Sequence, residues 1–499
     1  MRFLPRRRRF VAGLLLAPLL TGCFASEGGE ESSGGGDDSR LRVALAFPPA
    51  ENFNPYGADA TILSRLGVTE GLTRLDANGA AAPALAESWS RENDGSWLFT
   101  LRDAAFQDGT EVTPKAVAAA LTRAAGAEPV TAALSGVELT AEAAGDRRVR
   151  VTTAEPDPAL PLRLSSPGLV VLSSKAYADK DAVSPIGTAT GPFELTKVTG
   201  TTAATLDRFD DYWGGRAQAS GVDAKFIADG TARTNALRTG AADIAEAVPV
   251  SQATSLDEVA RRETATTRTT SLLLNTEKGA FKDPKARAAA REAIDTSDLA
   301  RGVYEGHADS GVGIYGPALT WAADKRVKPT GRAEALAVDG TSVTVATYDN
   351  RPELPEVAQV LKQQLEKAGF KVKLEVREYS RLEGDALAGK FDAFVSARNT
   401  MLDTGDPLSI LASDYTCKGS YNLALLCDKK VDKAVAEAET VTDTAKRQDA
   451  AMTAEAAVLG TDAVVPLVHQ RIVTGVGAAI SGVLLDPYER GLVGVGTRR

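Results

Sequence analysis

Three charged side chains follow two predicted strands and could bind a small ligand that carries both charges. Arg351 follows a predicted strand at 343–347, and Asp403 and Asp406 follow one at 391–396. In open α/β sheets ligands bind beyond the carboxyl ends of the strands, so we expect these residues at one rim. There, a guanidinium and one or two carboxylates could hold the two ends of a zwitterion. The alternative is that Arg351 pairs with an aspartate or with solvent.

The composition excludes most kinds of catalytic and metal site. The 499 residues include only two histidines, His307 and His469, and three cysteines. So few histidines argue against a His-based metal centre and a Ser-His-Asp hydrolase, and three cysteines cannot build a four-cysteine zinc site. The net charge is −9, and it becomes −14 without residues 1–22, which argues against a nucleic-acid partner. We therefore expect no enzyme, no resident metal and no cofactor.

Three further features are interpreted as structural or left open. Residues 311–316 fit G-x-G-x-x-G, but no strand precedes them and Pro317 follows. This favours a glycine-rich loop over a dinucleotide site. His469 follows an apolar run, which favours a structural residue over a nickel ligand. Trp321 lies in a predicted loop and could line the ligand cleft, and packing in the core or on the surface is the alternative.

The elements that would position the rim have clear periodicities. Residues 343–347 alternate as in a strand, apolar residues recur at helical spacing over 354–365, and residues 370–376 alternate again. This order predicts a right-handed βαβ unit in a parallel sheet. Thr113-Pro114 and Asp283-Pro284 predict two further helices, ending near Ala125 and Ile294. The chain as a whole has the pattern of an α/β fold, and its length suggests about three domains or two large lobes.

The N-terminus is typical of an export signal. Five arginines flank an apolar stretch at 10–20 that is too short to span a bilayer. The following LTGC, residues 20–23, resembles a bacterial lipobox, in which cleavage precedes a cysteine that carries lipid. We therefore expect a signal peptide at 1–22, lipid on Cys23 and a flexible tether at 23–40, on the extracytoplasmic face of a bacterial membrane. An ordinary secretory signal with an incidental cysteine is the alternative.

The other two cysteines, Cys417 and Cys427, stand ten residues apart. Outside the cytosol such a pair usually oxidises, so we expect a disulfide that holds a short loop in shape. Two buried thiols are the alternative.

A series of motifs occurs in the order found in one protein family. They are VTEGLTRLDANGAAAPALAESWS at 68–90, FQDGT at 106–110, GPF at 191–193, DYWG at 211–214 and LRTGAADI at 237–244. From about residue 41 to the C-terminus the chain resembles the family 5 solute-binding proteins of ABC importers, the peptide- and nickel-binding group. Gln107 stands where this family usually has histidine.

The resemblance implies a two-lobed α/β fold of the periplasmic-binding-protein type (class II), with an extra subdomain in lobe 1. Lobe 1 is expected at 41–268, with the subdomain at about 61–184. Lobe 2 is expected at 269–469, and residues 470–499 would return to lobe 1. The two lobes would close on the ligand by a hinge motion.

The resemblance also implies a monomeric receptor that delivers its ligand to an ABC permease. Asp403 matches the position that holds the peptide α-amino group in dipeptide-binding relatives, and Arg351 matches the one that holds the carboxylate. A short peptide is therefore the expected ligand, and a nickel chelate or metallophore is the alternative within the family. A secreted peptide hydrolase and a sensor or adhesion lipoprotein are the alternatives from other classes.

Overall fold

The largest sheet joins two hydrophobic cores. The computed structural model describes residues 39–499 apart from 129, 180, 181 and 350, and within them this sheet has eleven strands in the order β15-β14-β16-β12-β17-β11-β1-β10-β9-β8, with β13 paired to β17. Its strands are β1 (Arg40–Leu45), β8 (Phe193–Thr199), β9 (Ala203–Arg208), β10 (Gly221–Phe226), β11 (Ile244–Val248), β12 (Arg261–Leu274), β13 (Ala308–Ser310), β14 (Ser342–Tyr348), β15 (Lys371–Arg377), β16 (Ala393–Asn399) and β17 (Val464–Val476).

One core is built from residues 41–244 and 476–493, the other mainly from residues 272–468. The parts of the chain around these cores are called lobe 1 and lobe 2. Lobe 1 has helices α1 (Ala60–Arg65), α2 (Pro114–Ala125), α3 (Leu160–Arg163), α4 (Gly230–Arg238) and α5 (Val250–Ala253). Lobe 2 has α6 (Pro284–Ala293), α7 (Thr296–Gly302), α8 (Thr320–Asp324), α9 (Glu353–Lys367), α10 (Glu383–Leu387), α11 (Pro407–Tyr415), α12 (Lys429–Glu439) and α13 (Thr444–Gly460).

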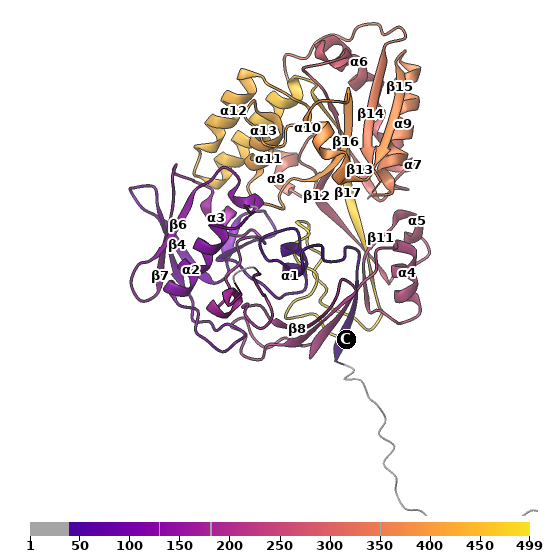
Figure 1. The fold of residues 1–499 in the computed structure, drawn as a ribbon. Coiled ribbons are helices and arrows are strands. Elements are labelled where there is room, and N and C mark those ends of the chain that lie inside the picture. The colour runs from indigo at the N-terminus through magenta and orange to yellow at the C-terminus, as the bar shows by residue number, and fades with distance from the viewer. Residues whose placement is uncertain (1–38, 129, 180–181, 350) are drawn as a thin grey trace, which may run out of the picture. The chain divides into compact units, whose positions relative to one another are not determined.

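Strands β12 and β17 connect the two lobes as long antiparallel neighbours (Figure 1). Their ladder is interrupted between the pairs Ala265–Arg471 and Thr269–His469, where three residues of β12 face one residue of β17. A second shift follows between Thr270 and Ser271. Bulges of this kind bend a strand and re-aim its side chains. The irregular section of the strand pair that connects the lobes is therefore at residues 266–271.

The structure confirms the predicted βαβ unit. Strand β14 runs parallel to β15 on one side and to β16 on the other, and α9 packs against β14 and β15 (Figure 1). Apolar residues of α9 at 354, 357, 358, 361 and 365 are buried. The two predicted helix starts are also confirmed, because Thr113 accepts a hydrogen bond from Ala116 N–H, and Asp283 from Lys285 N–H.

The chain between β1 and β8 forms a smaller, separate sheet in lobe 1. It has the order β4-β5-β7-β6, and β2 and β3 form a separate hairpin. The strands are β2 (Thr73–Leu75), β3 (Ala81–Pro83), β4 (Ala86–Arg91), β5 (Trp97–Leu101), β6 (Leu139–Ala143) and β7 (Arg148–Thr153). Residues 86–163, which contain this sheet with α2 and α3, are called the β4–β7 region.

Some predictions fall outside the described residues. The signal peptide at 1–22, Cys23 and most of the tether are among residues 1–38, and Asn350 beside Arg351 is also outside. The lobe and subdomain boundaries stay predictions. Within the described part of the chain, no helix combines the length and apolar character needed to cross a bilayer.

Candidate ligand-binding cleft

Arg351 lies where strand β14 ends, directly before α9. Its side chain is half-buried, and no residue in the described part of the chain forms a hydrogen bond or ion pair with it. Burial and the nearby Arg268 guanidinium lower the pKa of Arg351, and the Glu489 carboxylate acts in the opposite direction. A guanidinium that is partly removed from water and has no partner gains a strong interaction when an anion binds.

The nearest complete ion pair at this edge joins Glu489 to Arg268. Arg268 donates from Nε to Oε1 at 3.0 Å and from Nη2 to Oε2 at 3.1 Å, and Asn399 Nδ2 donates to Oε1 at 3.0 Å. Burial opposes ionisation of Glu489, but Arg268, with smaller contributions from the charges of Arg65 and Arg351, lowers its pKa to about 2. The Glu489 carboxylate is therefore charged and already bound to Arg268, and the Arg351 guanidinium, which no described residue bonds to, can accept an anionic ligand group.

Asp403 follows β16 and lines a cavity of ≈610 Å³ between lobe 2 and the β4–β7 region. Nothing among the described residues forms a hydrogen bond or ion pair with its carboxylate. Arg398 lines the same cavity, but its guanidinium donates to Asp414 at 3.1 and 3.2 Å and lies 4.5 Å from the centre of the Tyr421 ring. An ammonium group arriving at Asp403 would meet a carboxylate to which no described residue is hydrogen-bonded, in the field of the Arg398 and Arg490 guanidinium charges. The structure thus places Arg351 and Asp403 after the carboxyl ends of neighbouring parallel strands.

Asp406 has different surroundings from those expected of a ligand-binding residue. It forms a bidentate ion pair with Arg447, at 3.0 and 2.6 Å, and both side chains are only 7% exposed. It also accepts a hydrogen bond from Leu408 N–H as the N-cap of α11. Because its oxygens are already engaged, Asp406 holds α11 against α13 and is not part of the ligand contact that we propose below.

Trp321 is on the short helix α8, not in the expected loop. The centre of its ring lies 5.9 Å from that of the Tyr315 ring, and Trp321 lines a cavity of ≈250 Å³.

Cys417 and Cys427 are joined in a disulfide, as expected. Their loop carries Lys418 and Tyr421, which line the cavity at Asp403, so the disulfide constrains one wall of the cleft.

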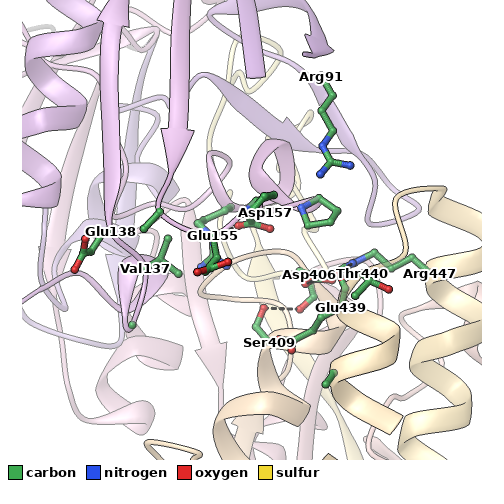
Figure 2. A pocket seen from close by; sticks show the side chains of 16 residues that line it. Arg91, Val137, Glu138, Glu155, Asp157, Asp406, Ser409, Glu439, Thr440 and Arg447 are labelled. Atoms are coloured by element: carbon green, nitrogen blue, oxygen red, sulfur yellow. Dashed lines mark hydrogen bonds and ion pairs between the residues drawn. The ribbon is translucent and has the colours of Figure 1, made fainter. Parts of the chain in front are cut away.

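Three cavities lie in a row between lobe 2 and the β4–β7 region. The cavity at Asp403 shares Arg163 and Glu439 with a second one of ≈660 Å³, which shares Arg447 with the ≈250 Å³ cavity at Trp321. Figure 2 shows the second cavity, with acidic side chains of the β4–β7 region on one side and residues of α11 to α13 on the other. The cleft therefore continues from Asp403 to Trp321.

The C-terminal segment ties the two lobes together beside this cleft. Arg490 is 8% exposed. Its Nη1 donates to the carbonyl and hydroxyl oxygens of Ser165 at 2.9 Å, and its Nη2 donates to the carbonyl oxygens of Met401 and Leu402 at 2.7 Å. Burial lowers the pKa of Arg490 to about 10. Carbonyl groups of both lobes thus surround one guanidinium.

His469 is a structural residue of β17 beside the bulged section. Val312 N–H donates to its Nε2 at 3.3 Å, and its Nδ1 lies 2.9 Å from the Thr269 hydroxyl, which donates to the Ile314 carbonyl at 2.9 Å. This network requires the neutral ring with the proton on Nδ1. The glycine-rich loop 311–316 packs closely here, because a Cβ at Gly316 would overlap the His469 ring.

Sequence reasoning missed Arg398, Glu489 and Arg490. Arg398 could have been found from the sequence, because it lies near the end of a predicted strand. That strand was expected to end at residue 396, but it extends to Asn399. Glu489 and Arg490 lie in a segment without helical or strand periodicity, and their partners are 221 and 325 residues away in the chain. No local pattern marks such residues.

Comparisons with known proteins agree with this architecture. Residues 80–422 match the family described as bacterial extracellular solute-binding proteins, family 5 middle. The chain is 24% identical to the nickel-binding protein NikA of Staphylococcus aureus, over 86% of this chain and 87% of that protein. It is 25% identical to the glutathione-binding protein GsiB of Escherichia coli K12, over 87% of this chain and 90% of that protein.

Solved structures share the two-lobed α/β fold. The nickel ABC transporter protein of Bacillus halodurans has a TM-score of 0.75 and 24% identity, covering 92% of this chain and all of that one. The binding protein DppA of Helicobacter pylori, solved with the peptide STSA, has a TM-score of 0.73 and 20% identity, covering 92% of this chain and 98% of that one. The expected fold class is confirmed.

Proposed function

The chain belongs to family 5 of the bacterial extracellular solute-binding proteins, and we propose from this premise that it captures a short peptide between its lobes and delivers it to the permease of an ABC importer. A peptide-bound and a glutathione-binding relative support a peptide ligand. Binding would favour closure through contacts with both lobes, and a shift from 1:99 to 99:1 requires about 5.5 kcal/mol.

One observation carries the proposal. Arg351 and Asp403 follow the carboxyl ends of two neighbouring parallel strands, and no described residue forms a hydrogen bond or ion pair with either side chain, while Arg268, Glu489 and Arg398 are already paired. A free peptide supplies the two missing partners, a carboxylate for Arg351 and an ammonium group for Asp403. Charge-assisted hydrogen bonds of this kind are strong, and a ligand without the charges would leave desolvated groups unpaired.

We expect Arg351→Ala and Asp403→Ala each to weaken binding of tri-alanine by more than tenfold, measured by isothermal titration calorimetry. The amidated peptide should bind the wild-type protein more weakly than the free acid does, but bind Arg351→Ala as well as the free acid does. The N-acetylated peptide should behave in the same way with Asp403→Ala. Such pairing of a protein change with a ligand change isolates one contact.

Arg381→Ala serves as the control, because Arg381 is an exposed arginine of the same lobe. Its affinity for tri-alanine should equal that of the wild-type protein. Melting temperatures of the ligand-free variants should be nearly unchanged, since neither Arg351 nor Asp403 forms an ion pair with a described residue. Wild-type affinity in both Arg351→Ala and Asp403→Ala would contradict the assignment.

A nickel chelate is the second candidate ligand, supported by the similarity to nickel-binding relatives. In the described part of the chain, no group of three or more His, Cys, Asp and Glu side chains is placed to hold a metal ion. A chelator would therefore have to supply the metal ligands and present its carboxylates to Arg351. Tight binding of Ni²⁺ with histidine, together with no binding of any di- to pentapeptide, would favour this candidate.

We also propose that the protein acts as a lipid-anchored monomer, with Cys23 as the modified residue after removal of residues 1–22. The expected result is that wild-type protein partitions into the membrane fraction of a bacterial host, while Cys23→Ser is released, because the thioether-linked lipid is the proposed anchor. Mass spectrometry of the N-terminal peptide would check the modification directly. Membrane partitioning of Cys23→Ser equal to that of the wild type would contradict the proposal.

A further inference from the structure

Three of the four tryptophans in the chain line one small cavity at the end of the cleft. Trp89 and Trp97 come from β4 and β5, which are neighbouring strands of the β4–β7 region, and Trp321 comes from α8 of lobe 2. The cavity has a volume of ≈250 Å³. Its walls thus come from lobe 2, from the β4–β7 region and from the β2–β3 hairpin.

Each of the three indole rings also contacts a residue that does not line the cavity. Trp97 Nε1 donates to the carbonyl oxygen of Asp157 at 2.9 Å. The Trp89 ring lies 6.1 Å from that of Phe99, and the Trp321 ring 5.9 Å from that of Tyr315. Rings whose orientation is already set lose little conformational freedom when a ligand group packs between them.

The charges around the cavity favour a neutral occupant. Of the described residues that line the cavity, one is charged, namely Arg447. Its guanidinium is neutralised by the ion pair with Asp406. The remaining walls are tryptophan, proline, alanine, leucine and glycine, with Thr442, Thr444 and Gln448 at one side. A cavity of this size and lining suits one aromatic ring, since aromatic pairs pack favourably in tilted and edge-to-face arrangements.

The length of the loop from Asp403 to Pro407 limits which residue of the peptide can carry the aromatic ring. One loop lines all three cavities in turn, with Asp403 in the first, Asp406 in the second and Pro407 in the third. Four residues span at most about 14 Å, and an extended peptide covers the same distance in about four residues. A peptide whose amino group is at Asp403 would therefore bring a side chain from within its first five residues to the tryptophans.

We propose that this cavity, formed by Trp89, Trp97 and Trp321, is a subsite for a neutral aromatic side chain within the first five residues of the peptide. The inference rests on the proposed function, because it takes a peptide anchored at Asp403 as its starting point. It narrows the proposed ligand to peptides that carry an aromatic side chain near the amino end, and it gives that side chain contacts with both lobe 2 and the β4–β7 region.

The test measures binding of penta-alanine and of four pentapeptides with one phenylalanine at position 2, 3, 4 or 5, by calorimetry and tryptophan fluorescence. At one of these positions phenylalanine should tighten binding to the wild-type protein at least tenfold and change the fluorescence. Trp321→Ala should reduce this gain below threefold while penta-alanine still binds. Ala80→Leu, which fills the cavity from the half-exposed β2–β3 turn, should do the same without removing a core ring.

Trp213→Phe is the matched control, because Trp213 bonds to Glu70 and does not line the cavity; the phenylalanine gain should persist in it. If penta-alanine binds but phenylalanine gives no gain at any position, or the gain persists in Trp321→Ala and Ala80→Leu, the subsite is overturned while the proposed function stands. If no peptide binds to the wild-type protein at all, the proposed function itself is overturned.

Discussion

Asp406→Ala is expected to lower the free energy of unfolding by about 3–5 kcal/mol, which is the usual cost of removing one partner of a buried ion pair. The variant would leave the Arg447 guanidinium, 7% exposed, without its carboxylate. The remaining donors of Arg447 bond to the carbonyl oxygens of Glu439 and Val441 at the end of α12, at 2.8 and 2.9 Å, and cannot compensate for the charge. Urea denaturation at neutral pH measures the effect.

Asp403→Ala is a matched control for this experiment, since it removes the same side chain three residues earlier in the same loop. It should change the free energy of unfolding much less than Asp406→Ala does, because no described residue forms a hydrogen bond or ion pair with the Asp403 carboxylate. The double variant Asp406→Leu with Arg447→Met should recover most of the loss, because it removes both charges together. An Asp406→Ala protein as stable as Asp403→Ala would show that the ion pair does not hold α11 and α13 together.

A second large effect is expected from pH through His469. Burial, with a smaller contribution from the Arg326 charge, lowers the pKa of His469 to about 4 from its ordinary 6.5, and Asp309 acts weakly in the opposite direction. Between these values the unfolded chain binds more protons than the folded one, so the free energy of unfolding rises with pH. The stabilisation is complete above pH 6.5 and is lost as the pH falls to 4, by about 3 kcal/mol over the whole window.

His469→Gln should remove this dependence, because glutamine does not titrate. We expect the loss of unfolding free energy between pH 7.0 and pH 4.5 to be about 2 kcal/mol smaller in the variant than in the wild type. His307→Gln is the control, since His307 is the other histidine of the chain and lies beside Glu263. Equal pH dependence in the wild type and His469→Gln would mean that the ring is protonated in the folded protein at no extra cost.

Local periodicity in the sequence was enough to predict the strands and the helix that position the residues at the rim of the cleft. The apolar spacing over 354–365 corresponds to α9 at Glu353–Lys367, and the alternation over 343–347 to β14. The strand predicted at 391–396 extends to Asn399 in the structure, because Arg268 of β12 pairs with Asn399. A strand end is decided by the neighbouring strand, and that neighbour is remote in the sequence.

The partners of charged residues could not be predicted in the same way. Asp406 and Asp403 belong to the same loop, and both follow a predicted strand. The structure separates them, because Arg447 from α13 reaches Asp406 while no described residue bonds to Asp403. Pairing of this kind depends on how helices from distant parts of the chain pack, and a side chain's availability for a ligand is set by that packing.

The order of Glu489 and Arg490 relative to their partners has a consequence for protein synthesis. Ribosomes synthesise from the N-terminus, so Arg268, Ser165, Met401 and Leu402 are translated before Glu489 and Arg490. The ion pair to Arg268 in the bulged strand and the bonds that join Ser165 to Met401 and Leu402 can therefore form only after residue 490 has been translated. A nascent chain that stops before residue 489 already encodes most of both hydrophobic cores, but it lacks these contacts between the two lobes.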